Sequence, residues 1–384
     1  MRRVAIDEAL PGMQLAKPVY DDTGRPLVTA GAQLSDRTVQ GLRDRGFISV
    51  MIEDEETAGI EIFEVVTERT RAVALKSVAR VQEVIAHARP AAGPGQEAGG
   101  EDAGKAAERL YLDVENIIDE IMDAEMIEGV SLLQSSGGSG LDISIDTAVV
   151  AVVVGKKLFL DRRGLHTVAA GSMLHDVGLS RLTSGLAEKP ESAMTAEQLR
   201  EFQTHTAAGF DIVRGLFKDQ PLVAHVAMQH HERQDGVGFP RGLTGNNRVL
   251  KPWQERTSGK FITLISEIAQ VARRFAELSS SGPWGEAQPP EVALKIMQQE
   301  AGLRLNEEVV KRFLEVAPPF PVGQEVVFTA GKLQGFRGIV AEVNPLHRDR
   351  PVVRVLRDVQ GRPVKPVQLE LWKYPDMKIA SRLS

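Results

Sequence analysis

Cysteine is absent from this 384-residue sequence, and long apolar runs and clusters of basic residues are missing as well. Without cysteine, disulfides and thiolate-bound metals are excluded, and a reducing compartment is favoured. The most apolar run, from Ala148 to Val154, is far shorter than the ~20 residues of a membrane-spanning helix. The N-terminal residues lack the apolar core of a signal peptide. These absences predict a cytoplasmic protein without a membrane span.

The charge balance argues against a nucleic-acid-binding protein. The formal net charge is −6, whereas neutralising nucleic-acid phosphates requires clustered lysine and arginine side chains. Hydrophobic residues make up 42% of the chain and charged residues 26%, which is the composition of an ordinary globular protein. A chain of this length can form two or three domains, each with its own core.

Changes in residue pattern divide the chain into three regions. Residues 1–62 contain short β-favouring runs, a turn-forming DDTGR segment and a helix start at Ser35, which predict a small α+β module. Residues 63–317 have mainly helical periodicity, which stops near SSGGSG and is broken by the glycine-rich turn at 235–247, and the Ala-, Gly- and Pro-rich segment 89–104 is expected to be a mobile loop. Residues 318–384 alternate β-branched runs with turns, which predicts a small all-β domain similar to a barrel.

Histidines are concentrated in the helical region, where six of the eight lie between positions 166 and 231. A single histidine on a helix is more often a packed or exposed residue than a metal ligand, so the question is whether several converge. His175 precedes Asp176, His205 stands alone, and the segment HHERQDGVGFPRGL begins with His230 and His231. Three imidazoles and a carboxylate suit an Mn, Fe or Zn ion, which commonly activates water for attack on phosphorus.

The order of these motifs resembles the HD-GYP subgroup of the HD metal-dependent phosphohydrolases, which hydrolyse the second messenger cyclic di-GMP. The resemblance covers about Glu64 to Val316 and rests on HDVG, THTAAGFDIV and HHERQDGVGFPRGL. It implies a multidomain, mainly α protein built around an HD-type helical bundle. It also implies a divalent transition metal bound by His175, Asp176, His205, His230 and His231, with Asp176 as the catalytic, metal-bridging residue. The signature loop implies that substrate is bound by Asp235, Gly236, Gly238, Phe239 and Pro240, where Phe239 stands in place of tyrosine.

Several positions depart from the family pattern on one side of the two-metal site. The first histidine ligand of the family aligns with Ile143, and its late aspartate ligand aligns with Ser266. The glutamate of three-metal members falls on Ser139. The resemblance therefore implies that one ion keeps its ligands, Asp176, His205, His230 and His231, while the other loses half of them.

Charged residues near the substrate differ as well. The lysine that follows the His-Asp pair is replaced by Leu179, and the arginine-bearing segment reads GPWG at 282–285. Weaker charge stabilisation of a phosphoryl transition state is expected. Asp146 and Glu267 lie near the lost ligand positions in sequence and are alternative ligands.

Three functions remain open from the sequence. The ligand losses favour a degenerate HD-GYP signalling protein that keeps one Fe or Mn ion, or a Zn ion, and has reduced or no phosphodiesterase activity. The alternatives are an active cyclic di-GMP phosphodiesterase with an unorthodox site, and a structural or interaction hub. Cyclic di-GMP or a related nucleotide and protein partners are the expected partners. The long helices flanking segment 89–104 suggest a homodimer.

Overall fold

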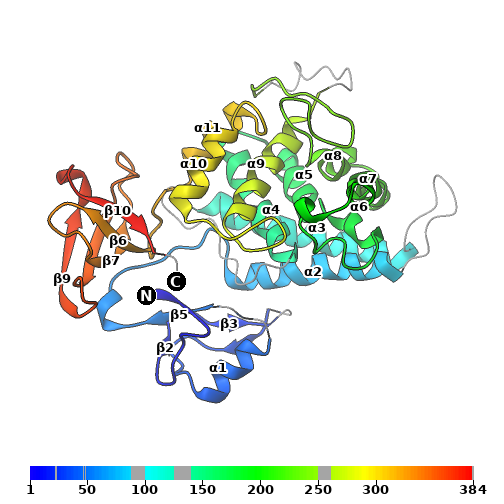
Figure 1. Ribbon diagram of the computed structural model, residues 1–384. Helices are drawn as coiled ribbons and strands as arrows, with labels where there is room; N and C mark the ends of the chain where they lie inside the picture. The colour runs from blue at the N-terminus through cyan, green and yellow to red at the C-terminus, as the bar shows by residue number, and fades with distance from the viewer. Residues whose placement is uncertain are drawn as a thin grey trace.

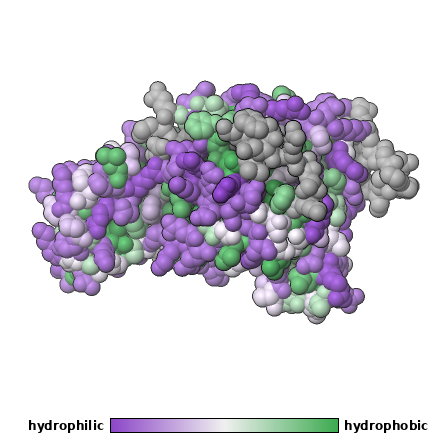
Figure 2. Space-filling model, turned by 90° about the horizontal axis from the view of Figure 1, so that it is seen from above, coloured by the Kyte–Doolittle hydropathy of each residue, from purple (hydrophilic) through white to green (hydrophobic). Residues whose placement is uncertain are grey.

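The computed structural model describes residues 1–21, 24–45, 47, 49–87, 100–124, 140–249 and 261–382. The protein is mainly helical, with small β modules at its N-terminal and C-terminal ends, coloured blue and orange to red in Figure 1. Each module and the helical body has a hydrophobic core of its own. The face shown in Figure 2 is predominantly hydrophilic, with hydrophobic residues in small patches.

The N-terminal module contains an antiparallel sheet in the order β1-β5-β2, a β3–β4 hairpin and one helix. The Ser35 side chain caps that helix by accepting a hydrogen bond from the amide of Thr38, and its Val39 and Leu42 side chains are buried. The hairpin and the helix are the ones that the sequence predicts. The elements are β1 (Arg2–Ala5), β2 (Gln14–Leu15), β3 (Val19–Tyr20), β4 (Pro26–Val28), α1 (Asp36–Arg43), β5 (Ser49–Glu53) and the short 3-10 helix η1 (Glu55–Thr57).

The helical body surrounds α4, which is mostly apolar and is buried from Ile143 to Gly155. Helices α5 and α9 pack along it. The helices are α2 (Glu68–His87), α3 (Gly100–Asp123), α4 (Gly140–Lys157), α5 (Arg162–Met173), α6 (Ala196–Gln203), α7 (His205–Leu216), α8 (Pro221–Gln229), α9 (Leu264–Leu278), α10 (Pro290–Glu300) and α11 (Glu307–Leu314), with the 3-10 helices η2 (Val177–Arg181) and η3 (Glu191–Ala193).

One expected loop is shorter than the sequence pattern suggests. Helix α3 begins at Gly100, so residues 100–104 are helical although they belong to the segment 89–104. The apolar periodicity of the following residues extends the helix backward across them, because each added turn gains backbone hydrogen bonds. Residues 88–99 lie outside the described part of the chain.

The C-terminal module is an antiparallel sheet in the order β10-β6-β7-β8-β9. Within the described residues β9 and β10 are the outer strands of this sheet, and the barrel-like form expected from the sequence stays a prediction. Arg354 donates to the carbonyl oxygen of Ala58 at 2.7 Å, and Arg357 pairs with Glu56, which joins this sheet to the N-terminal module. The elements are β6 (Glu325–Ala330), β7 (Arg337–Glu342), β8 (Val352–Arg357), β9 (Pro363–Glu370), η4 (Leu371–Lys373) and β10 (Lys378–Ser381).

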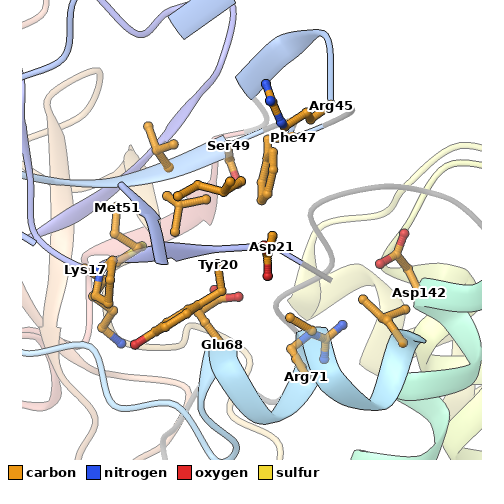
Figure 3. Close-up of a pocket in the computed structure, with 16 residues that line it drawn as sticks. Lys17, Tyr20, Asp21, Arg45, Phe47, Ser49, Met51, Glu68, Arg71 and Asp142 are labelled. Carbon is orange, nitrogen blue, oxygen red and sulfur yellow. The ribbon is translucent and has the colours of Figure 1, made fainter. Parts of the chain in front are cut away.

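A cavity of about 520 Å³ lies between the N-terminal module and helices α2 and α4 (Figure 3). Tyr20 and Phe47 contribute aromatic rings to its wall, and Arg71 and Asp142 contribute charges. None of the site residues expected from the sequence lines this cavity. Among the described helices, none combines the length and the apolar character needed to cross a membrane.

Candidate metal centre

Two glycines allow the segments that carry the histidines to approach closely. A Cβ atom on Gly178 would lie 2.0 Å from the carbonyl oxygen of His205, so η2 can contact α7 only with glycine there. A Cβ atom on Gly171 would lie 2.5 Å from Cγ2 of Val226, where α5 meets α8. Helix α8 therefore packs against both α5 and α7, and η2, which begins directly after Asp176, packs against α7.

Asp176, His205, His230 and His231 converge at this point, with one ligand atom from each within 4.8 Å of all the others. Oδ1 of Asp176 lies 3.2 Å from Nε2 of His230 and 3.6 Å from Nε2 of His205. The Nε2 atoms of His205 and His230 are 3.1 Å apart. Residues from three separate segments thus direct nitrogen and oxygen atoms at a common centre.

Backbone hydrogen bonds determine which nitrogen of each imidazole faces the centre. Nδ1 of His205 donates to the carbonyl oxygen of Phe202 at 2.6 Å, and Nδ1 of His230 donates to that of Ala227 at 2.8 Å. A carbonyl oxygen only accepts, so Nδ1 carries the proton and a neutral ring keeps its lone pair on Nε2. Nε2 of His231 is buried and has no hydrogen-bond partner within the described residues. Such lone pairs gathered around a carboxylate fit a cation, and this donor set suits Fe, Mn or Zn.

The electrostatic environment keeps these residues in the protonation state that a metal requires. Burial lowers the pKa of His230 from 6.5 to about 3, against the opposing effect of Asp176. Burial also lowers the pKa of His205 and of His231. For Asp176, burial alone would raise the pKa, but the neighbouring His175 and His230 outweigh it and hold the pKa well below its usual value. Neutral imidazoles and an ionised carboxylate are the forms that bind metal.

His175 lies on the other side of the Asp176 carboxylate and outside the four-residue cluster. Its Nδ1 donates to the carbonyl oxygen of Ser172 at 2.7 Å, and its Nε2 lies 3.0 Å from Oδ2 of Asp176. The two carboxylate oxygens therefore face different partners, with Oδ1 toward His205 and His230 and Oδ2 toward His175. This is the arrangement expected of a carboxylate that bridges two sites.

The positions expected to be altered on the His175 side carry no metal-binding side chain. Ile143 is buried on α4, and its hydrocarbon side chain has no atom able to bind a metal. Ser266 accepts a hydrogen bond from Oγ1 of Thr263 at 2.9 Å and donates one to the carbonyl oxygen of His225 at 3.2 Å. Its hydroxyl therefore joins the first turn of α9 to α8. Ser139 lies outside the described residues.

Both alternative ligands contact other partners. Asp146 forms an ion pair with Arg71, whose Nη2 lies 2.6 Å from its Oδ1, and both side chains are buried. Glu267 accepts a hydrogen bond from Nε2 of Gln234 at 2.8 Å. Neither belongs to the cluster around Asp176 within the described part of the chain.

The signature loop after His231 is held by contacts within itself. Asp235 pairs with Arg233, and a Cβ atom on Gly238 would lie 2.5 Å from the carbonyl oxygen of His231. The Phe239 ring stacks on the imidazole of His231, with centroids 4.3 Å apart and an angle of 19° between the planes. The loop thereby fixes the orientation of His231. Substrate binding by Asp235, Gly236, Gly238, Phe239 and Pro240 stays a prediction.

Beside the cluster opens a cleft of about 350 Å³, with Asp176 and His231 on its wall. Four cationic side chains also line it, namely Lys189, Arg273, Arg274 and Arg304. Sequence reasoning expected a loss of positive charge here and missed these residues. The signal was the pair Arg273–Arg274 on helix α9, but only the fold shows that η3, α9 and the segment after α10 meet at the cleft.

Comparison with known proteins agrees with this geometry. Residues 130–248 match the family model described as HD domain. The 3'3'-cGAMP-specific phosphodiesterase 3 of Vibrio cholerae is 28% identical over 176 residues, which cover 44% of this chain and 34% of that protein. A cyclic di-GMP phosphodiesterase of Thermotoga maritima is 32% identical over 144 residues, or 37% of this chain and 35% of that protein. The structure of an HDG"Y"P protein from Bdellovibrio bacteriovorus aligns with 82% of this chain and 98% of its own, at a TM-score of 0.47 and 13% identity.

The chain spans about a third of the length of these two curated relatives. The matched segment contains all four clustered residues, from Asp176 to His231. The motif order, the convergence of these side chains and the family match lead to one assignment. Residues 130–248 carry an HD domain, and this part of the chain is similar to cyclic dinucleotide phosphodiesterases.

Proposed function

We propose that the protein is a cyclic dinucleotide signalling protein that binds one divalent transition metal ion and has reduced or no phosphodiesterase activity. The observation that carries this proposal is the asymmetry around Asp176. Oδ1 faces a set of imidazoles, whereas Oδ2 faces His175 alone among the histidines of the described residues. The resemblance assigns Ile143 and Ser266 to the missing ligands of that second side, and neither side chain can replace them.

A bound ion would supply Lewis acidity and lower the pKa of a coordinated water molecule. The residues of the chain contribute the rest. Asp176, His205, His230 and His231 hold the ion, and Phe239 fixes the plane of His231 by stacking on it. Hydrolysis by two ions needs a second one roughly 3.5–4 Å from the first, to stabilise the leaving oxygen. His175 and Oδ2 of Asp176 alone are too few ligands to hold that second ion firmly.

An active phosphodiesterase is the second candidate, and the cationic cleft favours it. Lys189, Arg273, Arg274 and Arg304 are able to stabilise negative charge on a phosphodiester beside a single ion. Relatives named as phosphodiesterases point in the same direction. The two candidates differ in turnover and not in metal binding.

Metal analysis combined with turnover separates these candidates. The purified protein is loaded with Mn²⁺ or Fe²⁺ under anaerobic conditions, its metal content is measured, and cyclic di-GMP and its linear product are followed by chromatography. The proposal expects one ion per chain and little or no product. Rapid turnover that disappears in Asp176→Ala would instead establish the phosphodiesterase.

A matched variant controls for the loss of a carboxylate elsewhere. Asp211 lies on α7, near His205 in sequence, and its side chain is 69% exposed. Asp211→Ala should keep the metal content of the unaltered protein, whereas Asp176→Ala should lose it. If the unaltered protein binds no metal and His230→Ala leaves its stability unchanged, a structural hub is the correct function.

A further inference from the structure

The arginines on the cleft wall differ in how many of their donor groups are paired with carboxylates of the protein. Arg274 contacts Glu300 twice, with Nη2 2.6 Å from Oε1 and Nε 2.9 Å from Oε2. Its Nη1 lies 3.7 Å from Glu277. These contacts connect α9 to α10 and use the donor groups of Arg274, so its role is structural.

Arg273 retains an unused donor. Its Nη2 lies 2.7 Å from Oε1 of Glu277, but its Nε is buried and has no hydrogen-bond partner among the described residues. The side chain is only 12% exposed, so bulk water cannot readily solvate that group. Arg273 lines the cleft together with Asp176 and His231, and its charge adds to burial in lowering the pKa of His231.

Arg304 has weaker contacts with carboxylates than Arg273 has. Within the described residues, the carboxylate at ion-pair distance is that of Glu300, 3.9 Å away, and Glu300 already binds Arg274. Burial and the charge of Arg274 lower the pKa of Arg304. A guanidinium that is partly buried beside a second one is unfavourable unless an anion joins them.

We propose that Arg273 and Arg304 bind a phosphate group of a nucleotide phosphodiester in this cleft, in place of the cations absent at Leu179 and 282–285. This inference rests on the proposed function and names the residues that would hold its ligand. Charged guanidinium donors form strong hydrogen bonds with phosphate oxygens. Asp176 and His231 share the cleft, so the phosphate would lie next to the ion.

An aromatic side chain in the cleft favours a nucleotide over a simpler phosphate. Trp284 lines the cleft, and its Nε1 donates to the carbonyl oxygen of Ser280 at 2.9 Å, which fixes the indole. A fixed indole provides a flat apolar surface for a base. The cleft volume of about 350 Å³ lies within the range of pockets that bind small molecules.

Calorimetric titration of the full-length, Mn²⁺-loaded protein tests the inference, with cyclic di-GMP and inorganic pyrophosphate as separate probes. Arg273→Gln and Arg304→Gln should each weaken cyclic di-GMP binding about tenfold to a hundredfold, the effect of losing a charged hydrogen bond. Arg304→Lys should recover part of the loss. Arg214→Gln, at an exposed arginine of α7, should leave the affinity unchanged. Metal content should remain that of the unaltered protein in the Arg304 and Arg214 variants.

The inference is overturned if the Arg304→Gln protein keeps its metal and binds cyclic di-GMP as tightly as the unaltered protein does. It is also overturned if the unaltered protein binds neither probe. The proposed function fails on different measurements, which are the absence of metal or rapid turnover by the unaltered protein. Arg304 is the decisive position, because Arg273 packs near the metal cluster and its variant could lose the ion as well.

Discussion

At the scale of single residues, the ion pair between Arg71 and Asp146 is the most consequential contact outside the metal cluster. Its side chains are 5% and 1% exposed, and it connects α2 to the central helix α4. Two charges removed from water in this way are tolerated only together, because each compensates the desolvation of the other. The pair also explains why Asp146 is not available as a metal ligand.

Replacing Asp146 by asparagine should destabilise the protein strongly, because the Arg71 guanidinium would remain buried without a carboxylate. The expected loss is about 3–5 kcal/mol in the free energy of unfolding, measured by urea denaturation. Glu83→Gln is the matched control, since Glu83 pairs with Arg80 at an exposed position and should change stability little. A loss no larger than that of the control would show that Arg71 is solvated in the folded protein.

At the scale of elements, the site depends on how closely short segments approach one another. The cluster is formed by the residue before η2, the first residue of α7 and the two residues that follow α8. None of these segments forms a metal site alone. Their approach depends on small residues, of which Gly178 allows the shortest distance.

Gly178→Ala should separate η2 from α7, because the new methyl group would overlap the carbonyl oxygen of His205. We expect a loss of roughly 1–3 kcal/mol in stability, as for overpacked interiors, and at least a tenfold loss in Mn²⁺ affinity. Metal titration followed by paramagnetic resonance measures the affinity. Gly215→Ala is the control, since a Cβ atom there meets nothing within 4 Å. Equal affinity in both variants would argue against the importance of this contact.

Helices α4 and α9 carry the positions that the resemblance assigns to the lost ligands. The double variant Ile143→His with Ser266→Asp should raise the metal content from one ion per chain toward two, because it adds an imidazole and a carboxylate on the side of His175. Elemental analysis of the purified double variant, with each single variant alongside, checks this. Turnover of cyclic di-GMP should rise together with the second ion. A metal content that stays at one would mean that these positions do not face Asp176.

At the scale of the whole molecule, the protein has three separate hydrophobic cores. The two β modules contact each other where Arg354 and Arg357 bind Ala58 and Glu56. The buried histidines all lie in the helical body. Its buried histidines make the stability of the protein depend on pH. The pH dependence appears in the free energy of global unfolding, since unfolding exposes all of these histidines to water.

Without metal, the protein should become less stable as the pH falls from about 6.5 toward 3. The pKa of His230 is 6.5 when exposed and about 3 in the folded protein, so the unfolded chain binds a proton in this window that the folded chain does not. Stability then falls by about 1.4 kcal/mol per pH unit for this residue, and His205 and His231 act in the same direction. Urea midpoints at pH 7.5, 6 and 4.5 measure the slope. His230→Gln should reduce it, and an unchanged slope in that variant would contradict the assignment.

Much of the site could be predicted from the sequence, because motifs such as HDVG and HHERQDGVGFPRGL keep ligand residues in a fixed local order. That order alone predicts His205, His230 and His231 as metal ligands. The cationic cleft could not be predicted in this way. Lys189, Arg273 and Arg304 come from distant segments, and no local pattern relates them.

The sequence by itself determined the local elements and the identity of the residues able to bind a metal, since helix caps, apolar periodicity and adjacent histidines are short-range features. Only the tertiary structure decided which of those residues meet. In the folded protein Asp146 forms an ion pair with Arg71 and does not join the cluster around Asp176. Arginines from two separate segments line the same cleft. The physical reason is that a buried charge takes its partner from whichever segment packs against it, and packing is a property of the whole fold.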